Sequence, residues 1–274
     1  MKYILCCVIC LPFLVAQDDG SYDLIIKYNK GDIFKYKTDF IMAMSVPGMG
    51  NFEIGRVFTL ENKYLGEEDG LIIVEQIMTK MIATNKVWDK MSTDYKMNQM
   101  VDVPYKIYIK PDGTIDHISS EHRHLEETIS SLTQDVGQIN YLYPFGIEAI
   151  DVSVGDTWNV KNDSVVFYAG EGDIESLMFI DSDYSFDKIK IKKGREIAYI
   201  SEISKLRCKM IIVQGGTFME GEMYGDFKGS YRFDLDNGKV LLKKSSGNME
   251  YNFIMEDKSF KSVMSISEKT KKVK

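Results

Sequence analysis

Three histidines are the residues best suited to acid–base or metal chemistry, and they lie within eight residues of one another, at His117, His122 and His124. Neutral imidazole, with the carboxylates that surround these positions, is a ligand that zinc prefers. On a helix, however, side chains two residues apart point about 200° away from each other, so His122 and His124 would diverge. We therefore expect no metal site and no cofactor. An enzyme that uses the segment His117–Glu127 is the less favoured alternative.

The sulfur-containing residues indicate packing rather than catalysis. Cys208 alternates with Leu206 and Met210, which places all three on one apolar face of a strand and predicts a core thiol rather than a nucleophile. Met42 and Met44 also share a strand face, but no histidine or cysteine joins them, so a Cu(I) site is disfavoured. Thioether side chains repack easily and suit an adaptable apolar wall. No Gly-x-Ser-x-Gly motif is present. We expect a protein that is not an enzyme.

Composition narrows the class further. The chain has 274 residues, 34 Lys and Arg against 41 Asp and Glu, and a formal net charge of −7. A nucleic-acid-binding protein would need a basic patch, which this balance disfavours. A hydrophobic fraction of 44% with 27% charged residues can bury a sizeable core and excludes an intrinsically disordered chain.

The beginning of the sequence predicts an export signal. Lys2 is followed by an uncharged, mostly apolar run from Tyr3 to Ala16, and then by Gln17 and two aspartates. This is the order of a signal peptide, with cleavage near Ala16. The run is too short for a membrane span, which needs about 20 residues. We expect a periplasmic or secreted protein with no transmembrane segment in the mature chain, in which Cys208 is the one remaining cysteine.

Alternation of apolar and polar residues predicts long antiparallel strands. From residue 34 to residue 46 the even positions are mainly apolar and the odd positions mainly polar, and the next strand alternates in the same way. Successive side chains of a strand point to opposite faces, so one face of this pair is apolar. We predict that this face binds ligand. Its candidate residues are Phe34, Tyr36, Phe40, Met42, Met44, Phe52, Ile54 and Phe58.

One helix is expected, from Glu121 to Val136. Ser120 could cap its start and Gly137 suits its end. Its apolar stripe would pack on the strands, and it adds three candidate ligand-binding residues, Leu125, Ile129 and Leu132.

Three glycines of the first half have counterparts in the second half at nearly constant spacing. Gly31 and Gly70 recur 124 residues later, and Gly113 recurs 125 residues later. This register favours an internal repeat. The predicted fold is mainly β with a minor α component: two similar curved antiparallel sheets, or half-barrels, with one helix between or against them. The expected divisions are a signal peptide (1–16), a first β half (17–118), a connecting helix and linker (119–150), a second β half (151–260) and a Lys-rich tail (261–274).

The export signal, the Gly-Asp that precedes a long aromatic strand, the run Gly155-Asp156-Thr157-Trp158 and the late Asn-Gly turn occur together here. In these features the chain resembles an uncharacterised family of exported Gram-negative bacterial β proteins, over roughly residues 22–260. That resemblance brings no functional residues with it. A looser likeness, of architecture alone, is to periplasmic lipoprotein carriers of the Lol type, and it implies a binding role.

These observations together predict an exported, non-enzymatic protein that binds or carries a hydrophobic or lipid-like ligand in the periplasm. The alternative is a structural or interaction scaffold of the cell envelope. The partners expected are a hydrophobic small molecule or an envelope protein, and not nucleic acid.

Overall fold

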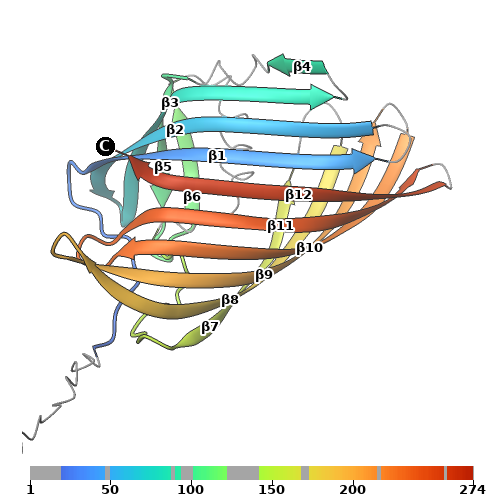
Figure 1. The fold of residues 1–274 in the computed structure, drawn as a ribbon. Helices are drawn as coiled ribbons and strands as arrows, with labels where there is room; N and C mark the ends of the chain where they lie inside the picture. The colour runs from blue at the N-terminus through green and yellow to red at the C-terminus, as the bar shows by residue number, and fades with distance from the viewer. Residues whose placement is uncertain are drawn as a thin grey trace, which may run out of the picture.

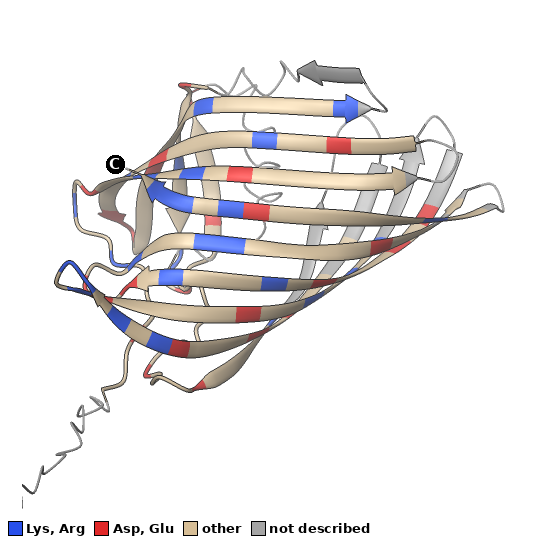
Figure 2. Cartoon of the chain, in the orientation of Figure 1, with Lys and Arg blue, Asp and Glu red and all other residues tan. Residues whose placement is uncertain are grey.

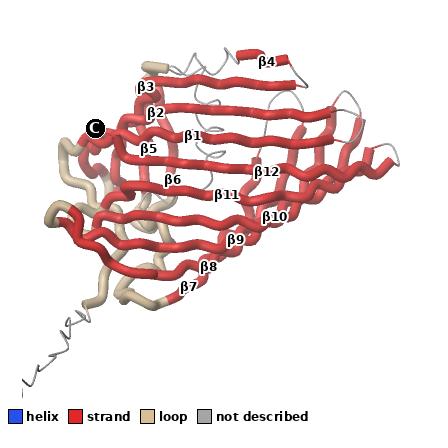
Figure 3. The backbone as a smooth tube through the Cα atoms, viewed as in Figure 1, coloured by secondary structure: helices blue, strands red, loops and turns tan. Residues whose placement is uncertain are grey.

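The computed structural model describes residues 20–46, 50–87, 90–93, 101–121, 142–167, 173–214, 217–255 and 258–273. They contain twelve strands and no helix (Figures 1 and 3). The strands are β1 (Ile33–Val46), β2 (Gly50–Glu68), β3 (Leu71–Val87), β4 (Lys90–Thr93), β5 (Pro104–Ile109), β6 (Ile115–Ser120), β7 (Thr157–Phe167), β8 (Asp173–Lys192), β9 (Arg195–Gln214), β10 (Thr217–Asp234), β11 (Lys239–Met255) and β12 (Lys258–Val273). Within the same ranges no helix is long and apolar enough to span a membrane.

All twelve strands belong to one antiparallel sheet. Its order is β6-β5-β3-β2-β1-β12-β11-β10-β9-β8-β7, and β4 pairs with the far end of β3. The expectation of two separate sheets is therefore wrong. The two halves are joined because β1 pairs with β12 from Lys35↔Val273 to Ser45↔Val263. The alternation of apolar and polar residues along a strand specifies which face of that strand is buried. It does not specify which other strand pairs with it.

The prediction for the Lys-rich end of the chain is also corrected. Residues 261–274 were expected to form a tail, but residues up to Val273 lie in β12, at the centre of the sheet. Lys269 is paired with Asp39 and Lys271 with Lys37, so these lysines occupy the polar face of a central strand. The expected helix from Glu121 to Val136 lies outside the described residues beyond Glu121, and Ser120 closes β6.

The glycines that share the 124–125 spacing occupy similar turns. Asp69-Gly70 joins β2 to β3 and Lys193-Gly194 joins β8 to β9, with positive φ at both residues of each turn, namely 51° and 78°, then 52° and 74°. Two successive left-handed residues are the signature of the type I′ hairpin, which matches the twist of the strands. At Gly113 and Gly238 the preceding residue has no positive φ, so the type I′ turns that Asp-Gly and Asn-Gly suggest there are not formed.

The strand starts correspond as well. The Gly31 amide donates to the Tyr64 carbonyl at 3.2 Å, and the Gly155 amide donates to the Phe186 carbonyl at 2.8 Å. In both places the aspartate that follows accepts a hydrogen bond from the amide three residues before it, so the chain enters β1 and β7 by the same local geometry.

The main core lies at the end of the sheet where these turns meet. Two segments cross it: Leu24 donates its amide to the Ala149 carbonyl at 2.9 Å, and Tyr22 exchanges amide hydrogen bonds with Val152. Phe145 is fully buried between the strands and these segments and makes edge contacts with the rings of three other aromatic residues. Burying such side chains contributes about 1.5–3 kcal/mol each.

Candidate functional site

The sheet has two chemically different faces. We call the face that carries Met42 and Phe58 the core face, and the opposite one, which carries Ile41 and Lys37, the outer face. The register brings the predicted site residues of β1 and β2 together on the core face, because Met42 lies opposite Ile54 and Met44 opposite Phe52. Phe34 and Phe58 are 7% exposed, and Tyr36, Phe40, Met42, Met44, Phe52 and Ile54 are half-buried. Leu125, Ile129 and Leu132 lie outside the described residues.

The second half extends this apolar surface. Met264 of β12 lies between Met44 and Met249, and Ile266 lies opposite Met42. We call the resulting cluster the methionine surface; its members are Cys208, Met223, Met249 and Met264, packed against Met42, Met44, Leu206, Phe227, Tyr251 and Ile266. Sequence reasoning placed only residues of the first half and of the expected helix in the site. The alternation of Met249 and Tyr251 carried the same signal, but the pairing of β12 with β1 was needed to connect it.

The methionine surface is built from strands. The described crossing segments, which contain Leu24 and Phe145, pack in the main core at the other end of the sheet and contribute no member to the methionine surface. Unbranched thioether side chains adapt their shape to what they touch. This part of the core face therefore has the chemistry of an adaptable apolar binding wall.

A belt of polar side chains separates the methionine surface from the main core. On β9, Ser204 and Glu202 lie between Leu206 and Ile200. The Glu202 carboxylate accepts hydrogen bonds from the hydroxyls of Tyr231 and Ser204, both at 2.5 Å, and of Ser182 and Tyr184, both at 3.3 Å. A Cβ atom at Gly229 on the neighbouring strand would collide with this carboxylate, so glycine makes room for it. Sequence reasoning missed this belt, because its residues are ordinary strand serines and glutamates until the register places them together.

The belt continues on β11 and β12. Glu268 accepts hydrogen bonds from the Lys243 ammonium at 3.0 Å and from the Thr270 hydroxyl at 2.9 Å. Thr270 also contacts Thr38 of β1, with 2.8 Å between the hydroxyl oxygens. Burial raises the pKa of Tyr231 well above its ordinary value, and the negative charge of Glu202 raises it further. The Tyr231 hydroxyl is thus held as a donor to Glu202, whereas the charge of Glu268 is paired with Lys243.

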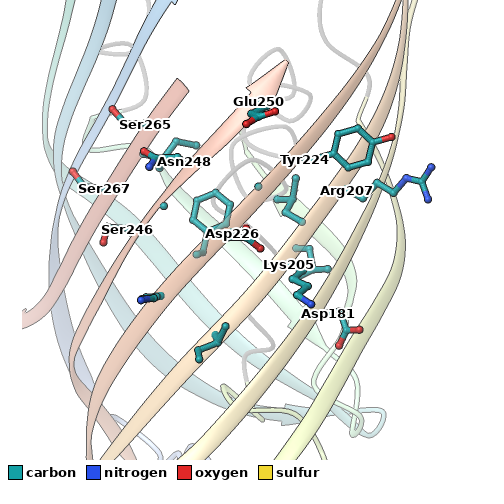
Figure 4. Close-up of a pocket in the computed structure, with 18 of the residues that line it drawn as sticks. Asp181, Lys205, Arg207, Tyr224, Asp226, Ser246, Asn248, Glu250, Ser265 and Ser267 are labelled. Atoms are coloured by element: carbon teal, nitrogen blue, oxygen red, sulfur yellow. The ribbon is translucent and has the colours of Figure 1, made fainter. Parts of the chain in front are cut away.

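The outer face carries a different feature, a hollow of about 1360 Å³ that extends across β7 to β12 and reaches Ile41 of β1 (Figure 4). Its charges are mixed, with Lys205 opposite Asp226 on the paired strands. The Arg207 guanidinium lies over the Tyr224 ring, 5.4 Å from its centroid. Serines and Asn248 line the side toward β11 and β12. The hollow thus carries no single sign of charge, and it was not predicted from the sequence.

The residues first considered for chemistry are placed as follows. His117 is exposed, stacks on Tyr108 with ring centroids 4.0 Å apart, and contacts Asp116 at 2.8 Å. His122 and His124 lie outside the described residues, as does most of the segment His117–Glu127. Among the residues that are described, no three of His, Cys, Asp and Glu are grouped to hold a metal ion. Cys208 is 1% exposed, and burial raises its pKa to about 11.

Comparisons with known proteins give a fold and no family. No family model and no curated protein matches the chain. Among solved structures, lipovitellin matches over 90% of this chain with a TM-score of 0.54 at 9% identity, and the match covers 26% of the lipovitellin chain. This chain is thus similar in fold to about a quarter of that protein. An outer membrane protein of Vibrio cholerae and a mutant of the Rh. blastica porin match with TM-scores of 0.23 and 0.24, from which we draw nothing.

Proposed function

We propose that this protein is an exported, non-enzymatic β protein that binds a lipid-like amphiphile on the core face of its sheet. The observation that carries the proposal is the methionine surface, a continuous apolar wall from β9 to β1. The described crossing segments contribute no residue to this surface. The matched part of lipovitellin supplies support at the level of fold only.

The polar belt favours an amphiphile over a plain hydrocarbon. An acyl chain on the methionine surface would reach the hydroxyls and carboxylates around Glu202 and Glu268 where the apolar wall ends. Buried polar groups are costly unless they are hydrogen-bonded, so a ligand with a polar head suits this boundary better than one without. Glu202 has hydroxyl partners and forms no ion pair with a described cation, whereas Glu268 pairs with Lys243. A hydroxyl- or amine-bearing head group matches that chemistry.

The test uses a fluorescent fatty-amine probe and a fatty-acid probe with the chain that begins at Gln17. Saturable binding of at least one probe is expected. Met44→Asp should weaken that binding at least tenfold, because a carboxylate on an apolar wall must be desolvated when the ligand covers it. Ser45→Asp is the matched control, since Ser45 is the next residue of β1, is exposed and points to the outer face.

Two outcomes would count against the proposal. A well-folded protein that binds neither probe saturably removes the carrier function and favours a structural scaffold of the envelope. Equal loss for Met44→Asp and Ser45→Asp would place the ligand elsewhere. If Met44→Asp unfolds, Met44→Ser on the folded protein gives the same comparison with a smaller change.

A further inference from the structure

The hairpin that joins β8 to β9 concentrates positive charge in an acidic protein. Between Lys188 and Arg195 the chain has five cationic residues and no carboxylate, although the whole chain carries a net charge of −7. Figure 2 shows this blue hairpin at the end of the sheet where β8 turns into β9. We call residues 188–195, together with Tyr199 and Arg232, the basic hairpin patch.

Four of its cations surround one aromatic ring on the outer face. Tyr199 lies between the buried Ala198 and Ile200, so its side chain is on the outer face. The ammonium groups of Lys188, Lys190 and Lys192 lie 5.6, 5.6 and 5.4 Å from the centre of the Tyr199 ring. The Arg232 guanidinium lies 5.6 Å from the same centre.

These four cations repel one another and have little internal compensation. None of these four cations takes part in an ion pair among the described residues. Arg195 is the one member of the patch that forms such a pair, with Asp234 at 2.7 Å. The hydrogen bond from Lys192 and the positive charges around Tyr199 lower its pKa, which reports the positive potential there. A site with that potential attracts anions.

The second feature is an exposed apolar side chain at the tip of the hairpin. Ile191 is 75% exposed and lies next to the tight turn at Lys193-Gly194. Side chains alternate along β8, so Ile191 points to the face opposite to Lys190 and Lys192. An isoleucine exposed at the tip of a lysine-rich hairpin is unfavourable in water. It fits the boundary of a lipid bilayer, where the isoleucine enters the acyl region and the lysine stems extend toward the head groups.

We propose that the basic hairpin patch docks the protein onto a membrane surface rich in anionic phospholipids, with Ile191 inserted. This interaction is made by the tip of the hairpin, with the lysines on its outer face and Ile191 on the opposite face. It goes beyond the ligand site at the methionine surface, on which it does not depend. Lysines near such a surface each raise the partition coefficient about fivefold. The cations complement anionic head groups, and the exposed Ile191 suits the acyl region of a bilayer. Together they favour a lipid surface over a soluble anion, which would engage the cations but not the isoleucine.

The experiment measures co-sedimentation of the chain that begins at Gln17 with vesicles of phosphatidylcholine alone or with an equal part of phosphatidylglycerol. Binding is expected only to the anionic vesicles, and it should fall steeply between 50 mM and 500 mM salt because the attraction is screened. Changing Lys188, Lys190 and Lys192 to Glu should lower the partition coefficient at least 100-fold. The matched control, which changes three other exposed outer-face lysines to Glu, should retain more; they are Lys161, Lys205 and Lys228.

Ile191→Ser tests the insertion with all charges kept, and it should lower the partition coefficient about tenfold. Equal binding to neutral vesicles, equal losses in the two triple variants, or an unchanged Ile191→Ser would overturn the proposal. Full displacement by inorganic phosphate at the same ionic strength as the salt control would assign the patch to a soluble anion instead. Met44→Asp should leave vesicle binding unchanged, so failure here and failure of the ligand proposal are distinguishable. Far-UV circular dichroism checks folding, and the Lys→Gln triple replaces the Glu triple if the latter unfolds.

Discussion

Tyr231→Phe isolates the energetic role of the polar belt, because it removes one hydroxyl and leaves the ring in place. The ring makes an edge contact with Phe145, with centroids 5.1 Å apart, and phenylalanine keeps that contact. What is lost is the hydrogen bond to the Glu202 carboxylate at 2.5 Å. A hydrogen bond to a charged group contributes about 1.5–3 kcal/mol, so the variant should lower the free energy of unfolding by about 2 kcal/mol.

The control is a second tyrosine on the same strand. Tyr224 also donates to a glutamate, Glu222, but it is 39% exposed and lies on the outer face. Tyr224→Phe should leave the urea midpoint unchanged, because water replaces the lost partner. Equilibrium urea unfolding followed by circular dichroism measures both variants. Equal midpoints for the two, or a loss below about 0.5 kcal/mol for Tyr231→Phe, would refute the view that the belt is a buried hydrogen-bonded unit.

The same variant has a pH signature. The folded-state pKa of Tyr231 is raised above the value in the unfolded chain, first by burial and then by Glu202. The unfolded chain therefore gives up the hydroxyl proton at lower pH than the folded protein. The stability that this hydroxyl contributes is fully present below about pH 10 and falls as the pH rises beyond it. Wild type should lose stability above pH 10 more steeply than Tyr231→Phe does.

Two other predictions concern the core thiol and the hairpin turns. Burial raises the pKa of Cys208 to about 11, so about one thiol in a thousand is ionised at pH 8. A disulfide reagent should therefore modify the folded chain that begins at Gln17 far more slowly than the same chain unfolded in urea. Equal rates would contradict burial of the thiol. Gly194→Ala and Gly70→Ala should each lower the free energy of unfolding by about 1–2 kcal/mol, because alanine is strained at φ of 74° and 78°. A loss of stability at only one of the two turns would show that their backbones differ in solution.

The sequence predicts the local parts of this fold well. The alternation from Phe34 to Val46 matches β1, and the even positions do lie on the buried side. Such patterns are read within one strand, where a period of two residues specifies a face. The glycines at positions 70 and 194 are recognised in the same way, because the requirement for positive φ is local.

The long-range pairing could not be predicted. Thr38 meets Thr270 across 232 residues of chain, and nothing in the neighbourhood of either threonine specifies the other. Without that pairing, the lysines near the end of the sequence indicate a solvated tail, and Met264 of β12 has no connection to Met42 and Met44. The apolar face was therefore predicted as far as β1 and β2, and its continuation through β12 and β11, together with the belt around Glu202, required the sheet order.

The pairing of β1 with β12 has a consequence for how the protein is made. The central seam of the sheet joins strands separated by 232 residues at Thr38 and Thr270, so β1 is synthesised long before its partner. Until β12 emerges, one edge of β1 has no strand beside it, and exposed strand edges are prone to pair with other chains. The five strands from β7 to β11 can pair with their sequence neighbours while β1 waits. We expect the pairing of β1 with β12 to be the slow step of folding. A chaperone that covers strand edges should raise the yield of folded protein most at this stage.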